Sequence, residues 1–136
     1  MGLFDKLKSN ELKLTPKAAL ALAAVTVIAS DGSVEDDEIN QLTRLVKGDE
    51  QALSSALAAY EKLSVADSVR LAAKALDGKQ RMACIAILLD LAMSDGILAG
   101  AEQELLNAYV EAFQLAEADI TGIVDVIALK NDFSVF

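Results

Sequence analysis

Two long apolar runs dominate the pattern of hydrophobic and polar positions along the chain. The first covers 18–29 almost without a break, and the second covers 82–93, interrupted only by Asp90. A helix that is apolar on every face belongs in a protein core, and both runs are shorter than the roughly 20 residues that a transmembrane helix needs. We therefore predict two buried helices, one over 16–30 and its counterpart over 79–94.

Polar residues that precede apolar stripes mark where helices are expected to start. Thr15 stands before Pro16, which is favoured at the first helical position. Ser33 is expected to cap the next helix, because Ser33 and Asp36, three places later, resemble a capping box. Asp49 and Ser64 stand at the expected starts of two further helices. The predicted helices are 16–30, 34–47, 50–63, 65–77, 79–94, 99–114 and 117–129.

No stretch shows the strict alternation of a strand, and the chain is 54% hydrophobic with a single Pro. These features predict an all-α protein, a single compact domain of about seven helices built from two pseudo-repeated helix-turn-helix units. We divide the chain into a short amphipathic segment, residues 1–14, and a helical domain, residues 15–136. The tail 131–136 is expected to be extended, with Phe133 or Phe136 pinned to the domain.

The N-terminal segment carries Leu3, Phe4 and Leu7 at helical spacing, which predicts a short amphipathic helix. So short a helix is a weak membrane anchor, so docking on its own domain is the preferred interpretation. Membrane contact is expected, if at all, only through residues 1–10.

A nine-residue acidic motif occurs twice, as SDGSVEDDE at 30–38 and as SDGILAGAE at 94–102, with a constant offset of 64 residues. Each copy follows one of the apolar runs and contains a Gly suited to a tight turn. We interpret the motif as part of an internal duplication, in which a buried helix, a turn and a second helix recur. We call residues 31–38 the first acidic corner and residues 95–102 the second.

Charge and composition exclude several functions. The net charge of −9 argues against nucleic acid as a partner, because binding phosphates requires clustered Lys and Arg. The chain has no His, which excludes His-based acid–base catalysis, Ser-His-Asp triads and the usual Cys/His zinc sites. Cys84, the only cysteine, lies in an apolar run and is interpreted as a core residue.

The first acidic corner resembles the second half of a calcium-binding EF-hand loop, with Asp, Gly, an aliphatic residue and Glu at the expected spacing. The first half does not fit. The upstream ligand positions hold Val27 and Ala29 in one copy and Leu91 and Met93 in the other, and apolar side chains do not coordinate calcium.

Another family fits better. The sequences ASDGSVEDDEI at 29–39 and LDLAMSDGIL at 89–98 resemble the TerB-like domain of bacterial tellurite-resistance proteins, over about 16–129 of the chain. The same helical domain occurs at the N-terminus of a membrane-anchored J-domain co-chaperone. The resemblance implies a compact all-α bacterial domain, tied to stress and metalloid resistance, whose acidic residues are proposed to bind divalent metal.

Carried over position by position, the resemblance assigns a metal-binding role to five acidic residues: Asp31, Glu38, Asp90, Asp95 and Glu102. Duplicated units often pack with pseudo-two-fold symmetry, which would bring both acidic corners together. Carboxylates gathered in one place repel unless a cation neutralises them, and oxygen-only ligands favour Ca²⁺, Mg²⁺ or Mn²⁺. The second corner lacks the acidic run of 35–37, which argues against a symmetric two-metal site.

Plainer roles compete with the metal site. The Asp residues can accept backbone N–H bonds in their own turns, and the Glu residues can stabilise helix N-termini. Asp90 stands alone in an apolar helix, so it either meets a cation, for which Arg81 and Arg44 are the candidates, or lines the same acidic pocket.

We expect the protein to be cytoplasmic. We also expect that it is not an enzyme, because no nucleophile, phosphate loop or cofactor motif is recognisable. Its function is expected to be that of a TerB-like stress-response domain with a protein partner, binding a divalent cation through the acidic corners. The alternative is a protein–protein or membrane-surface interaction module without metal.

Overall fold

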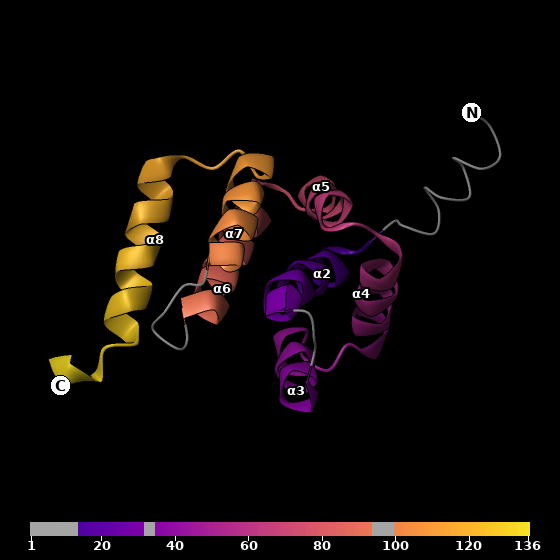
Figure 1. The fold of residues 1–136 in the computed structure, drawn as a ribbon, viewed down its shortest axis with the longest axis horizontal. Helices are drawn as coiled ribbons and strands as arrows, with labels where there is room; N and C mark the ends of the chain where they lie inside the picture. The colour runs from indigo at the N-terminus through magenta and orange to yellow at the C-terminus, as the bar shows by residue number, and fades with distance from the viewer. Residues whose placement is uncertain (1–13, 32–34, 94–99) are drawn as a thin grey trace.

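The structure, a computed structural model, describes residues 14–31, 35–93 and 100–136, and every regular element in these ranges is helical (Figure 1). The all-α class is therefore confirmed, and the α-helices of these ranges number seven, as predicted. In chain order the elements are α2 (Pro16–Ile28), the 3-10 helix η1 (Ala29–Asp31), α3 (Asp36–Leu45), α4 (Glu50–Lys62), α5 (Val65–Ala75), α6 (Gly78–Met93), α7 (Gly100–Ala112), α8 (Glu117–Lys130) and the 3-10 helix η2 (Phe133–Val135).

Three helices begin at the polar residues that the sequence indicated. Thr15 accepts a hydrogen bond from the backbone N–H of residue 18 at 3.2 Å, Asp49 from that of residue 52 at 3.0 Å, and Ser64 from that of residue 67 at 3.1 Å. Each bond satisfies an N–H group that the first turn of a helix leaves without a partner. Between α3 and α4 the chain turns through Gly48, whose φ of 77° suits glycine.

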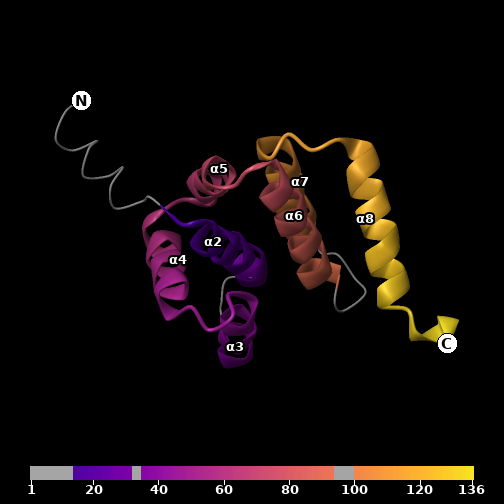
Figure 2. The ribbon, with the colours of Figure 1, turned by 180° about the vertical axis from the view of Figure 1, so that it is seen from behind.

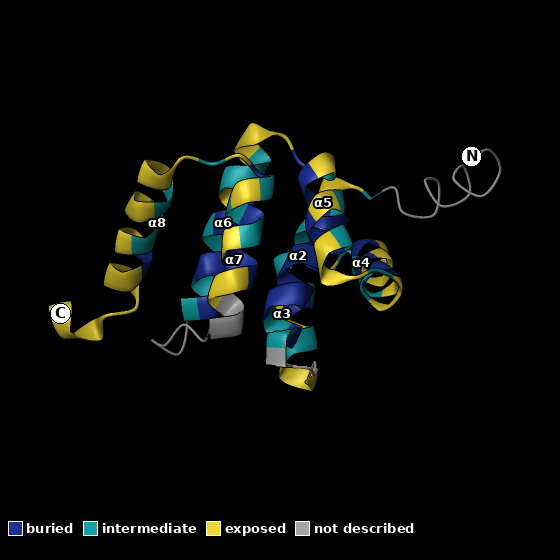
Figure 3. Cartoon of the chain, turned by 45° about the horizontal axis from the view of Figure 1, so that its top comes forward, coloured by how far each residue is buried: buried dark blue, intermediate teal, exposed yellow. Residues whose placement is uncertain are grey.

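Helix α2 lies at the centre of the fold. It contacts α3, α4, α5, α6 and α7, and nine of its thirteen residues are buried. Its many alanines allow neighbouring helices to approach closely, which is why so many helices can pack around one. Figure 3 shows α2 as a mostly buried helix among partly exposed ones.

The second apolar run forms α6, which packs against α2, α7 and α8. Five of its sixteen residues are buried, and they include Ile85 and Leu88. Tyr109 of α7 and Phe113, which directly follows that helix, are the largest fully buried side chains in the described ranges, with ring centroids 5.6 Å apart. Seen from behind in Figure 2, α8 lies at the opposite end of the molecule from α4. That the two units are related by duplication stays a prediction of the sequence.

The C-terminal tail differs from the expectation. Residues 133–135 form η2 instead of an extended strand, and Phe133 and Phe136 are 80% and 101% exposed, so neither is pinned to the domain. The cause is local: Asp132 accepts hydrogen bonds from the backbone N–H and the hydroxyl of Ser134, which start a short helical turn. The same bonds lower the pKa of Asp132 below its ordinary value.

The predicted N-terminal helix lies outside the described residues. None of the helices in the described ranges is both long and apolar enough to cross a lipid bilayer. Helix α8 continues through Gly122, and no atom within 4 Å would meet a Cβ there.

Candidate functional site

The first acidic corner begins where α2 ends. The chain leaves α2 through η1, whose last residue is Asp31, and re-enters helix at Asp36 with Glu35 as the N-cap residue. The carboxylate of Glu38 accepts a hydrogen bond at 2.9 Å from the backbone N–H of Glu35. Glu38 therefore has the local, helix-starting role that competed with metal binding, and this bond uses one of its two oxygens.

The predicted cap of this helix is wrong. Ser33 was expected at the N-cap, but α3 begins at Asp36 and the capping pair is Glu35 with Glu38; Ser33 itself lies outside the described residues. Two overlapping pairs in this stretch have the spacing of a capping box. The later start places Asp36, Asp37 and Glu38 in the first helical turn, where the helix dipole favours negative charge.

The 3-10 helix that leads into the first acidic corner contacts α7. Helix η1 contacts α7, the helix that carries Glu102, and the end of α2 is bonded to α7 by a buried hydroxyl pair. Thr26 Oγ1 donates to the carbonyl of Ala23 at 2.6 Å, so the hydroxyl of Tyr109, also 2.6 Å away, donates to Thr26. Burial raises the pKa of Tyr109 well above its ordinary value, so this hydroxyl keeps its proton.

Asp90 has a cationic partner. Lys130 Nζ lies 3.1 Å from both carboxylate oxygens of Asp90, which ties the end of α6 to the end of α8. Of the two arginines proposed from the sequence, Arg81 donates instead to the carbonyl of Ala73 at 3.1 Å. The side chains of Asp90 and Lys130 are 40% and 61% exposed, so the pair lies at the surface.

Three of the five candidate ligands have side chains outside the described residues. The carboxylates of Asp31, Asp95 and Glu102 lie outside the described part of the molecule. Among the residues that are described, no group of three or more acidic or cysteine side chains is arranged to hold a metal ion. The convergence of the two acidic corners stays a prediction, supported so far by the contact between η1 and α7.

Cys84 does not offer a nucleophile. It is buried in α6, and burial raises the pKa of its thiol to about 12. The thiol is therefore protonated at neutral pH, whereas nucleophilic cysteines act as thiolates.

A second concave feature was missed by the sequence analysis. We call it the α5–α7 groove: it has a volume of about 710 Å³ and lies between the first turns of α5, the end of α2, Tyr60 of α4 and one side of α7. Many of its lining residues are alanines, including Ala66 on α5 and Ala112 on α7. An alanine in a helix is an ordinary helix-forming residue, so nothing in the local sequence marks such a surface.

Comparison with known proteins gives one match. The family model of the tellurite resistance protein TerB matches residues 17–124, a range that begins in α2 and ends in α8. Neither the search of curated proteins nor the search of solved structures gave a match.

Proposed function

The chain belongs to the TerB family of tellurite resistance proteins, and on this premise we propose that it is a non-enzymatic domain that binds one divalent cation between its two acidic corners. The observation that carries the proposal is the contact of η1 with α7. This contact brings the end of the first buried helix, where Asp31 stands, to the helix of the second unit that carries Glu102.

The chemistry of the available donors limits the kind of cation. With no His in the chain and Cys84 buried and protonated, the donors are carboxylate and backbone oxygens, which suit Ca²⁺, Mg²⁺ or Mn²⁺. The described carboxylates do not make a site by themselves, so the proposal depends on the acidic corners. The residues that would hold the ion are Asp31, Glu38, Asp95 and Glu102.

Asp90 is left out of this set because Lys130 already neutralises its charge at the α6–α8 side of the molecule. A bound cation would remove the repulsion among the other four carboxylates and join the start of α3 to the start of α7. Its effect would therefore be to stabilise the domain and to order the surface around the two corners.

The test is the thermal stability of the full chain in millimolar Ca²⁺, Mg²⁺ or Mn²⁺. A cation present at 100 times its dissociation constant should add about 2.7 kcal/mol to the free energy of unfolding. Asp31→Asn combined with Asp95→Asn should abolish the increment. The matched control is Asp119→Asn with Asp125→Asn, which removes the same charge from exposed positions of α8 and should leave the increment intact.

Absence of any increment with all three ions would refute the cation site and favour the alternative function, an interaction module without metal. A specific observation supports that alternative. Large apolar side chains are exposed on α8, on η2 and at the residue that follows η2, with exposed fractions of 52% to 101%: Val126, Leu129, Phe133, Val135 and Phe136. Flotation with anionic vesicles, with and without residues 1–10, would then separate a membrane-surface role from binding of a protein partner.

A further inference from the structure

The α5–α7 groove has an apolar floor. Helix η1 contributes Ala29 to it, and α7 contributes Leu105 and Ala108. One wall includes Val65, which is 52% exposed although it is a large apolar residue. A concave, largely apolar surface of this size is suited to binding the apolar side chains of a peptide segment.

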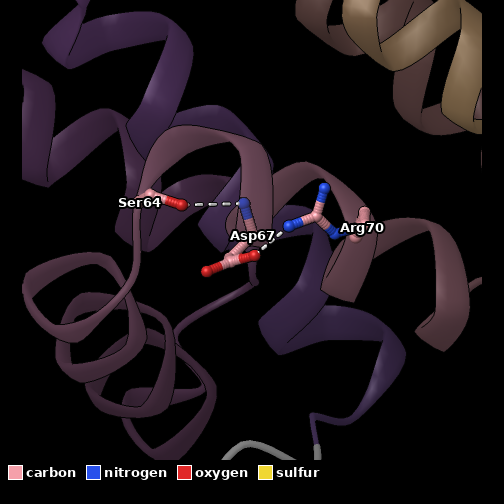
Figure 4. Close-up of polar contacts among 3 residues, drawn as sticks. All are labelled: Ser64, Asp67 and Arg70. Carbon is pink, nitrogen blue, oxygen red and sulfur yellow. Dashed lines mark hydrogen bonds and ion pairs between the residues drawn. The ribbon is translucent and has the colours of Figure 1, made fainter.

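The rim of the groove is charged, with an acidic excess. Arg70 stands on the α5 side, where its guanidinium forms an ion pair with Asp67, one turn earlier in the same helix (Figure 4). Glu104 and Glu111 stand on the α7 side, both exposed, and neither forms an ion pair with any other described residue. An apolar segment flanked by lysines would therefore match both the floor and the rim.

We propose that the α5–α7 groove binds residues 3–8 of the same chain. These residues offer three apolar side chains at helical spacing for the floor, and Lys6 and Lys8 for the acidic rim. Residues 1–13 contain three lysines and two acidic residues, which gives them a net charge of +1. Because the whole chain carries −9, residues 14–136 carry a net charge of −10. The segment is thus the one basic stretch at an end of an otherwise acidic protein.

The chain is long enough for this binding. Leu14 is partly buried against the core at the start of α2, and the groove lies at the other end of that helix. The thirteen residues of α2 span about 20 Å at 1.5 Å per residue, whereas the five residues 9–13 span about 17 Å when extended. Residues 3–8 add about 9 Å as a helix, so the linker and the segment together are longer than α2.

Docking of residues 3–8 uses none of the four proposed cation ligands, and the groove adjoins them through Ser30, which precedes Asp31. The groove becomes a docking site that its own N-terminal segment occupies, so any other apolar segment must compete with residues 3–8 in order to bind. The sequence predicts that the N-terminal segment docks on its own domain, and the α5–α7 groove is the surface that we propose for this docking.

The first test uses fluorescence. The chain has no Trp, so Phe4→Trp introduces a single indole whose emission reports its surroundings. The emission maximum should lie at a shorter wavelength than in the control Phe133→Trp, because Phe133 is 80% exposed. The difference should not depend on protein concentration. Equal maxima would overturn the proposal, as would a shift that appears only with anionic vesicles or only at concentrations where the chain dimerises.

Charge reversal tests the rim. In the Phe4→Trp background, Glu104→Lys with Glu111→Lys should move the emission to longer wavelength, whereas Asp119→Lys with Asp125→Lys, the same change in charge on α8, should not. Adding Lys6→Glu and Lys8→Glu to the groove variant should restore the shorter wavelength. The proposal is overturned if the added substitutions do not restore the shorter emission wavelength and the α8 variant shows the same shift to longer wavelength as the groove variant. The shift would then be a general effect of charge.

Crosslinking tests the position directly. Leu7→Cys should form an intramolecular disulfide with Ala66→Cys under mild oxidation and not with the control Ala118→Cys, at an exposed position of α8. Cys84 does not interfere, because its thiol is buried and has a pKa of about 12. Crosslinking to both positions at similar rates would contradict a defined site, and so would crosslinking to neither.

Discussion

Thr26 of α2 and Asp90 of α6 lie 64 residues apart, the offset of the predicted repeat, but their surroundings differ. Thr26 is 3% exposed, and its hydroxyl bonds both to its own helix and to Tyr109. The Asp90 side chain is 40% exposed and forms an ion pair with Lys130. At this position α2 therefore contributes to a neutral, buried pair of hydroxyl groups, whereas α6 contributes to a charged pair in contact with water.

The difference follows from how many helices surround each position. Helix α2 has five other α-helices around it, whereas α6 contacts α2 and α7 on one side and α8 on another. A carboxylate is tolerated only where water or a cation can reach it, while a short hydroxyl can close its bonds inside the core. The interruption of the second apolar run by Asp90 thus marks the side of α6 that is not at the centre.

Exchanging the two residues should have the largest effect. Thr26→Asp buries a carboxylate beside the hydroxyl of Tyr109 and should lower the free energy of unfolding by about 3–5 kcal/mol. Asp90→Thr removes an exposed ion pair and should change it by less than about 1 kcal/mol. Urea denaturation of the two variants, with Thr26→Val to separate loss of the hydrogen bond from burial of charge, measures both. Similar losses for both exchanges would mean that the two positions are equivalent.

Overpacking gives a second test of the same contrast. Ala19 and Ala83 are also 64 residues apart, but Ala19 is 0% exposed at the centre whereas Ala83 is exposed. Ala19→Leu should destabilise the protein by about 1–3 kcal/mol, because the added methylenes force neighbouring helices apart.

The matched Ala83→Leu should stay within about 0.5 kcal/mol of the native chain. The midpoints of urea denaturation show the difference directly, since equal slopes would mean that only stability has changed. If Ala83→Leu proved as destabilising as Ala19→Leu, the second apolar run would be as central as the first.

Short sequence motifs correctly predicted where several of the helices begin. Thr15, Asp49 and Ser64 cap helices where predicted, because each bond joins residues three apart and depends on little else. The start of α3 was misplaced because Ser33 and Glu35 both precede an acidic residue at the capping-box spacing. Short-range competition of this kind is decided by the surrounding fold.

Long-range pairings could not be predicted in the same way. Lys130, which pairs with Asp90, lies 40 residues further along the chain, and nothing in the local sequence distinguishes it from Arg81 or Arg44. Of the five predicted ligands, only Glu38 and Asp90 have described side chains: Glu38 bonds to the start of its own helix, and Asp90 pairs with the distant Lys130. The sequence therefore identified acidic positions without showing which of them share a surface.

The smallest expected effect concerns the Asp90–Lys130 ion pair itself. A double-mutant cycle with Asp90→Asn and Lys130→Met should give a coupling energy of about 0.2–1 kcal/mol, because solvent screens a pair that is 40% and 61% exposed. The coupling should fall as the salt concentration rises from about 0.01 to 1 M, since the screening length then drops from about 30 to 3 Å. A coupling above about 3 kcal/mol that salt did not reduce would mean that Asp90 is as enclosed as Thr26, and the contrast between the two buried helices would then disappear.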